Sequence, residues 1–157
     1  MLTVDRFKEA RTVLRGVISQ TELVYSQYLS DLSGNQVFLK PENMQVTGAY
    51  KIRGAYYKIS TLSEEEKARG LVTASAGNHA QGVAYAATAA GVKATIVMPT
   101  STPLVKVNNT KDYGGNVILH GEVFDDAAEL AAKIAEEQGL TYVHPFNDPV
   151  LATGQGT

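Results

Sequence analysis

Four short apolar runs recur from residue 71 onward, each separated from the next by a helical pattern. Glycines follow the helical patterns between them, as expected where a helix ends in the left-handed conformation. Strands that alternate with helices at this spacing predict βαβ units, and hence a parallel sheet with helices on its faces. The predicted fold class is therefore α/β, with a three-layer domain built on this sheet. The runs are LVTA (71–74), KATIVM (93–98), NVILH (116–120) and TYVH (141–144).

The first 60 residues follow a different pattern. Two helical stretches, about 3–15 and 21–32, precede one apolar run, QVFLK (36–40), and a further helix is expected to begin near Thr47 as its N-cap. One strand with no neighbour in sequence cannot complete a sheet. At the other end, LATGQGT has the small residues that lead into a next element. We therefore expect a nearly complete α/β unit, flanked by the start and the resumption of a second, larger α/β domain.

The composition argues against several classes of function. The net charge is -2, with Lys and Arg scattered along the chain, which leaves no basic patch for nucleic acid or an anionic membrane. No apolar run approaches the roughly 20 residues that cross a bilayer, and the N-terminus does not resemble a secretory signal. A cytoplasmic location is therefore expected. With no cysteine and three scattered histidines, neither a thiolate nucleophile nor a metal site is expected.

In TASAGNHAQG (73–82) a predicted strand runs directly into a predicted helix. Ligands bind beyond the carboxyl ends of parallel strands, and the free N–H groups of a helix start attract anions. The same pattern also fits a tight turn in which Asn78 merely caps the helix, and a lone histidine more often makes a structural hydrogen bond. The small or polar residues that a ligand would meet there are Ser75, Ala76, Gly77, Asn78 and His79.

The stretch AYKIRGAYYK (49–58) contains the lysine with the best case for chemistry. If its helix begins near Thr47, Lys51 lies in the early turns, where the positive end of the helix dipole disfavours an ammonium. A lysine with a depressed pKa is the amine that forms a Schiff base with an aldehyde cofactor. Most lysines are simply exposed to solvent. Only a second observation can favour chemistry at Lys51.

Taken together, TGAYKIRGA (47–55) and SAGNHAQGVA (75–84) resemble the fold-type II, tryptophan synthase β-like enzymes of pyridoxal phosphate. Within that class the chain is similar to the threonine dehydratase (threonine ammonia-lyase) family. The family usually has Ser-Phe-Lys where this sequence has Ala-Tyr-Lys. Further landmarks follow in order along the chain: QTELVYS (20–26), LKPEN (39–43), VMPTSTPLVKV (97–107), YGGNVILHGEVFDDA (113–127) and HPFNDP (144–149).

The resemblance implies a cofactor, pyridoxal 5'-phosphate, and a role for each motif. Lys51 would hold the cofactor as a Schiff base and move protons at the substrate. Tyr50 would lie against the pyridine ring, and Asn78 would hydrogen-bond the phenolic oxygen. The turn from Ser75 to His79 would bind the substrate carboxylate.

The reaction that the resemblance implies is β-elimination from a small amino acid. L-threonine would give 2-oxobutanoate and ammonia, and L-serine would give pyruvate. The implied domains are 1–49 and 146–157 in a large pyridoxal phosphate domain, and 50–145 in a small α/β domain. The family's glycine-rich phosphate loop would follow residue 157, so we expect this chain alone to be inactive. The full-length enzyme is expected to be a homo-oligomer.

Three other classes of protein agree less well with the sequence. Serine racemases share nearly all of these motifs but carry a serine where this sequence has Ala76, which favours the dehydratase. A non-catalytic ligand-binding module of the same fold is expected to have lost the lysine that Lys51 matches. A dinucleotide-binding unit is disfavoured because no G-x-G-x-x-G opens a helix.

Overall fold

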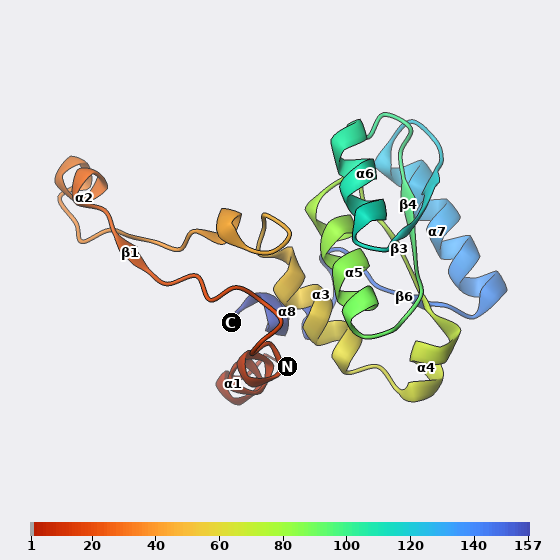
Figure 1. Ribbon diagram of the computed structural model, residues 1–157, viewed down its shortest axis with the longest axis horizontal. Helices are drawn as coiled ribbons and strands as arrows, with labels where there is room; N and C mark the ends of the chain where they lie inside the picture. Colours follow the sequence, from red (N-terminus) through yellow and green to blue (C-terminus); the bar gives the residue numbers. More distant parts are fainter. Residues whose placement is uncertain (1) are drawn as a thin grey trace.

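The computed structural model describes residues 2–157 and contains a central sheet of four parallel strands (Figure 1). The strands are ordered β5-β4-β3-β6, and each neighbouring pair is parallel. Each strand lies inside a run that the sequence predicts as a strand, so the α/β class is confirmed. The strands are β3 (Leu71–Ala74), β4 (Ala94–Met98), β5 (Asn116–Leu119) and β6 (Thr141–Tyr142).

Helices cover both faces of this sheet, as the predicted three layers require (Figure 1). One face packs against α5 (Asn78–Ala89) and α6 (Leu104–Asp112), and the other against α7 (Phe124–Gln138). Side chains alternate between the two faces along a strand. Leu71 accordingly joins the α5 side of the core, and Val72 joins the α7 side.

Local start and stop signals fix the helices as the sequence predicts. Helix α7 lies between two of the predicted strands and ends at Gly139, whose φ of 65° is in the left-handed region that glycine tolerates. Helix α4 (Glu64–Arg69) begins with a capping box: Ser63 Oγ accepts from the Glu66 N–H, and the Glu66 carboxylate accepts from the Ser63 N–H. These local features mark where α4 begins and where α7 ends.

Helix α3 (Lys51–Ser60) lies between α5 and α8 (Pro149–Gln155). Glycines allow this close packing. A Cβ added at Gly154 would lie 2.6 Å from the carbonyl oxygen of Arg53, and one added at Gly82 would lie 3.1 Å from the backbone nitrogen of Ile52. The backbone at the start of α3 is therefore held tightly against its neighbours.

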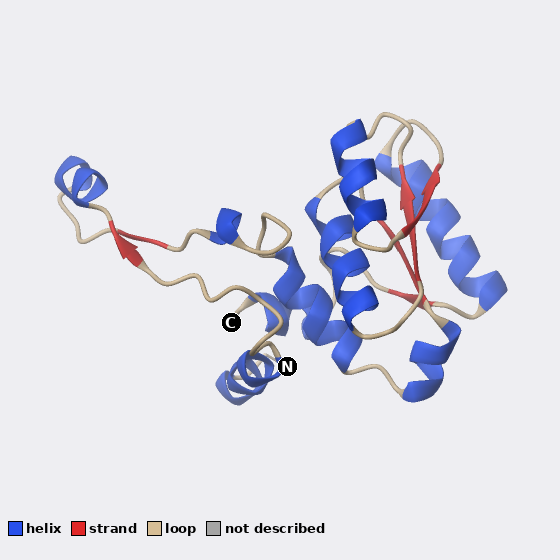
Figure 2. Ribbon diagram, viewed as in Figure 1, coloured by secondary structure: helices blue, strands red, loops and turns tan. Residues whose placement is uncertain are grey.

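The N-terminal segment differs from the prediction. After α1 (Val4–Val13), residues 21–32 do not form one helix: they contain the short strand β1 (Val24–Tyr25) and most of α2 (Gln27–Ser33). The run QVFLK does have a partner, because β2 (Phe38–Leu39) pairs antiparallel with β1. The 3-10 helix η1 (Glu42–Met44) follows it. Figure 2 shows that the β1–β2 ribbon and α2 extend away from the rest of the molecule.

Two further expectations are corrected. Thr47 does not cap α3, which begins after Tyr50, and its buried hydroxyl has no hydrogen-bond partner among residues 2–157. LATGQGT is mostly helical, since it lies largely within α8, which Asp148 caps by accepting from the N–H groups of Val150 and Leu151. No helix within residues 2–157 is both long and apolar enough to span a membrane.

Candidate active site

A cavity of about 380 Å³ lies where the chain leaves β3 and β6. These two strands are adjacent and parallel, so their carboxyl ends meet at one edge of the sheet. The chain then continues from β3 into α5 and from β6 toward α8. The cavity brings together all but one of the residues predicted for the site, the exception being Gly77. Its lining residues are Tyr50, Lys51, Ser75, Ala76, Asn78, His79, Phe124, Pro145 and Phe146.

Lys51 is the first residue of α3, and its ammonium reaches across the cavity edge. Its Nζ donates a 2.8 Å hydrogen bond to the carbonyl oxygen of Pro145 and lies 5.6 Å from the centroid of the Tyr50 ring. Burial lowers the pKa of Lys51 below its ordinary value, because desolvation destabilises the charged ammonium more than the neutral amine. A lysine in this environment supplies an amine nucleophile more readily than an exposed lysine does.

The turn after β3 presents the start of α5 to the cavity. No side chain caps this helix, so its first N–H groups are open to a ligand. Ser75 Oγ accepts from the Gly77 N–H at 3.2 Å, which holds the turn. A Cβ placed on Gly77 would meet nothing within 4 Å, so there is free space beside this residue. The turn can therefore receive a carboxylate or another anion.

Asn78 does not act as the N-cap of α5, a position that Gly77 takes. Its Oδ1 instead accepts a 2.9 Å hydrogen bond from Lys106 Nζ on α6. A lysine ammonium only donates, so this contact fixes which end of the Asn78 amide faces α6. The Nδ2 group has no hydrogen-bond partner among the described residues. It is free to donate to a ligand in the cavity.

His79 is 3% exposed, and its lowered pKa favours the neutral ring near pH 7. Burial lowers its pKa to about 4, outweighing the hydrogen bond that links its ring to Val143. The carbonyl oxygen of Val143 lies 3.3 Å from His79 Nε2 and also accepts from Thr73 Oγ1 at 2.7 Å, so Nε2 carries the proton. The buried Nδ1 has no partner within residues 2–157. Nδ1 is therefore an unpaired acceptor on a ring that lines the cavity.

Three aromatic or apolar residues of the cavity were not predicted from the sequence. Phe124 begins α7, while Pro145 and Phe146 follow β6. The rings of Phe124 and Phe146 are 6.3 Å apart. Pro145 and Phe146 do lie in HPFNDP, one of the landmarks named above, but their approach to Lys51 depends on how the strands pair.

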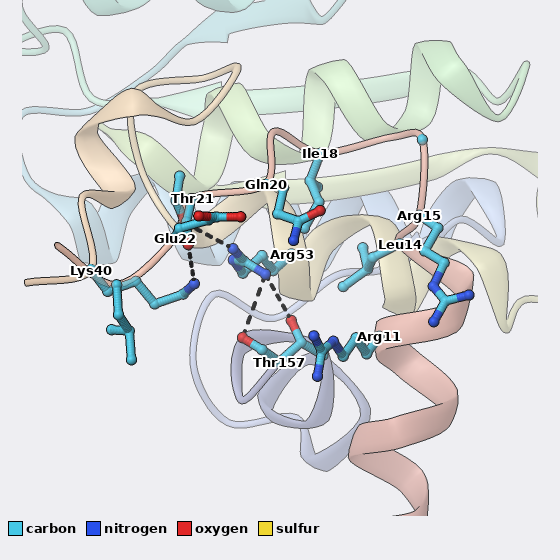
Figure 3. Close-up of a pocket in the computed structure, with 12 residues that line it drawn as sticks. Arg11, Leu14, Arg15, Ile18, Gln20, Thr21, Glu22, Lys40, Arg53 and Thr157 are labelled. Carbon is cyan, nitrogen blue, oxygen red and sulfur yellow. Dashed lines mark hydrogen bonds between the residues drawn. The ribbon is translucent and has the colours of Figure 1, made fainter.

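A second cavity, of about 780 Å³, contains Arg53 of α3 (Figure 3). Its guanidinium makes a bidentate ion pair with Glu42, at 2.9 Å from Nε and 2.8 Å from Nη2, and also contacts Thr21 and Thr157. Burial alone would raise the pKa of Glu42, but the hydrogen bonds from Arg53 and Thr21 outweigh it and lower the pKa to about 2. Because Arg53 is saturated by internal partners, this cluster anchors α3 and is not a chemical site.

A parallel sheet whose strand ends open onto a partly desolvated lysine and an uncapped helix start is the arrangement that the resemblance to fold-type II enzymes implies. The chain belongs to the family of pyridoxal-phosphate dependent enzymes, which matches residues 14–157.

The relatives agree on the family. The chain is 54% identical, over its whole length, to 39% of an L-threonine ammonia-lyase of Thermotoga maritima. The structure of a processed threonine deaminase from Solanum lycopersicum superposes with a TM-score of 0.87 at 40% identity, over 99% of this chain and 47% of that one. Maize serine racemase superposes with a TM-score of 0.92 at 36% identity, over 98% and 46%. The chain spans less than half the length of the curated relatives it matches.

The residues of the smaller cavity fit pyridoxal phosphate. Ligand pockets commonly measure about 300 to 1,000 Å³, a range that includes this one. Lys51 would supply a partly desolvated amine for an aldehyde, and Asn78 Nδ2 would supply N–H donors for a phenolic oxygen. The uncapped α5 start offers donors for an acidic substrate.

Proposed function

We propose that this chain forms part of a pyridoxal phosphate enzyme that eliminates water from L-threonine and then releases ammonia by hydrolysis, which takes up one water. The products are 2-oxobutanoate and ammonia, and L-serine would give pyruvate in the same way. The position of Lys51 is the main support for the proposal. Lys51 lies in the same cavity as the uncapped start of α5, and burial lowers its pKa. The names of the relatives support the substrate class.

Each residue of the smaller cavity would have a role that follows from its position. Lys51 Nζ would hold the cofactor and, when free of its proton, take the Cα proton of the substrate. Tyr50 would flank the ring, and Asn78 Nδ2 would donate to its phenolic oxygen. The residues from Ser75 to His79 would bind the substrate carboxylate at the start of α5. When bound, pyridoxal phosphate supplies an electron sink that makes the Cα proton acidic.

The proposal also covers the domain organisation of the enzyme. Residues 50–145 would form the small domain, while 1–49 and 146–157 would belong to the large pyridoxal phosphate domain. The exposed β1–β2 ribbon supports this division. Val24 and Phe38 are 55% and 52% exposed, and apolar side chains of this kind are expected to be covered by further parts of the large domain. The enzyme would be cytoplasmic and homo-oligomeric.

Serine racemisation is the alternative, supported by the close superposition on maize serine racemase. Racemisation needs an acid-base group on the opposite side of the cofactor from Lys51. Ala76 lines the cavity and cannot transfer a proton, which favours elimination. In a full-length enzyme, Ala76→Ser is expected to raise the rate at which serine racemises, measured by chiral chromatography. An unchanged rate would count against this assignment.

Borohydride trapping tests the proposal directly. A full-length enzyme that contains this chain is incubated with pyridoxal phosphate, reduced with borohydride and digested, and the modified lysine is located by mass spectrometry. A label confined to Lys51 is expected. Lys58 is a matched control, since it lies on the same helix but forms an ion pair with Asp148 at 2.9 Å. Lys51→Arg should abolish the label and Lys58→Arg should leave it intact. Equal labelling of both lysines would contradict the proposal.

A further inference from the structure

His144 lies at the start of the turn that carries Pro145, and the proposed function gives it no role. Its Nδ1 accepts hydrogen bonds from the backbone N–H groups of Phe146, at 3.2 Å, and Asn147, at 2.9 Å. One imidazole nitrogen therefore closes the turn. The ring is packed between aromatic neighbours: its centroid lies 4.8 Å from that of Phe146 and 6.1 Å from that of Tyr142.

These two bonds determine the form of the imidazole. A nitrogen that accepts has no proton of its own, so His144 is neutral and carries its proton on Nε2. The turn encloses Pro145, which is buried and has no N–H group to offer the backbone. Its carbonyl oxygen is the acceptor of the 2.8 Å hydrogen bond from Lys51 Nζ.

We propose that His144 is a positioning residue, which holds the 144–147 turn in the form that presents the Pro145 carbonyl oxygen to Lys51. The turn thereby fixes the resting position of the amine at the cavity edge. The importance of this turn for catalysis rests on the proposed function of Lys51. The hydrogen bonds of His144 and Pro145 do not depend on that function.

The inference predicts the state of His144 in the unaltered protein. A long-range ¹H–¹⁵N spectrum of the imidazoles, recorded on the full chain near neutral pH, should show His144 as the Nε2–H tautomer. A proton on Nδ1 would overturn the inference without any variant. This measurement does not depend on whether an altered chain folds.

Variants then separate the acceptor from the bulk of the ring. His144→Ala removes the acceptor, whereas His144→Asn places Oδ1 close to the position of Nδ1. His120→Ala is the matched control, because His120 is also a histidine just after a strand of this sheet and is exposed. Exchange of the Phe146 and Asn147 amide hydrogens should accelerate about tenfold in His144→Ala, the loss expected for one hydrogen bond. It should stay near the original rate in His144→Asn and in the control.

Lys51 provides the second readout, without cofactor. Without the Pro145 carbonyl, the ammonium loses its acceptor while burial still disfavours it, so the fraction of free amine rises. Competitive acetylation of Lys51 by acetic anhydride should therefore be at least about threefold faster in His144→Ala than in the original chain or in His144→Asn. An unchanged or slower rate would overturn the inference. If these results hold while borohydride trapping fails to label Lys51, the proposed function fails and this inference stands.

Discussion

Lys106 of α6 donates a 2.9 Å hydrogen bond to Oδ1 of Asn78, the first residue of α5. The contact connects two helices on the same face of the sheet and turns the Nδ2 group of Asn78 away from α6. The orientation needed to donate to a ligand is thus set in the protein itself, before anything binds. Such preorganisation reduces the cost of ordering the site when a ligand arrives.

The first prediction concerns this pair. Lys106→Met should release the Asn78 amide, because the only donor to its Oδ1 among the described residues is removed. The ¹H and ¹⁵N shifts of the Asn78 side-chain amide should change, whereas Lys106→Arg, which keeps a donor, should largely preserve them. Lys111→Met on the same helix is the control and should leave Asn78 unaffected. Identical Asn78 signals in Lys106→Met would refute the assigned orientation.

The second prediction concerns the packing of α3 against α8. Alanine ordinarily stabilises a helix relative to glycine by about 0.5–1 kcal/mol. At Gly154 the sign should reverse, because an added Cβ would lie 2.6 Å from the Arg53 carbonyl oxygen and 2.8 Å from Cα of Gly54. Gly154→Ala should lower the free energy of unfolding by about 2 kcal/mol, as overpacking does. Urea denaturation measures the free energy of unfolding. The control variant Ala152→Gly, on the same helix, gives the usual difference in stability between alanine and glycine in a helix.

The third prediction concerns the buried ion pair that anchors α3. The side chains of Arg53 and Glu42 are only 7% and 17% exposed. Glu42→Gln would leave the guanidinium without its counter-charge, at a cost of about 3 kcal/mol in the free energy of unfolding. Glu22→Gln, in the same cavity but at an exposed residue, should change it by less than about 0.5 kcal/mol. Equal effects of the two substitutions would show that the pair does not stabilise α3.

The pH dependence of this pair follows from the lowered pKa of Glu42. The carboxyl titrates near 4.5 when the chain is unfolded and at about 2 when it is folded. Its stabilising contribution is therefore complete above pH 4.5 and is lost as the pH falls toward 2. Glu42→Gln should show a smaller loss of stability over that interval than the original chain.

The sequence predicted the sheet well because its signals are local. An apolar run such as that of β4 must be buried on both faces in a parallel sheet, and a glycine such as Gly139 ends the preceding helix by its own backbone preference. The β1–β2 ribbon was missed for the opposite reason. Its strands have two residues each and are exposed, so neither length nor burial pattern marks them.

The candidate site was predictable where residues are neighbours in the sequence. The turn from Ser75 to His79 and the pair Tyr50 and Lys51 could be selected from their motifs. Pro145 could not be linked to Lys51 in this way, since they are 94 residues apart and meet only because β6 pairs with β3. The expected N-cap at Thr47 was wrong because α3 starts at Lys51, four residues later.

The last prediction concerns His79, whose pKa is lowered to about 4 by burial. An unfolded chain takes up a proton at this residue below about pH 6.5, whereas the folded chain stays neutral there until about pH 4. Between those values unfolding binds a proton, so stability must fall as the pH falls. From pH 7 to pH 5 this residue alone should remove about 2 kcal/mol from the free energy of unfolding.

Urea titrations at the two pH values measure the effect. His79→Leu should lose most of this dependence, even though the substitution also changes the stability at pH 7, because only the difference between the two pH values reports on the proton. His120→Leu should retain the dependence, since His120 is exposed and does not line the cavity. The interval lies above that of Glu42, so the two contributions can be distinguished. If His79→Leu keeps the full dependence, the imidazole is not the buried neutral group that lines the cavity beside Lys51.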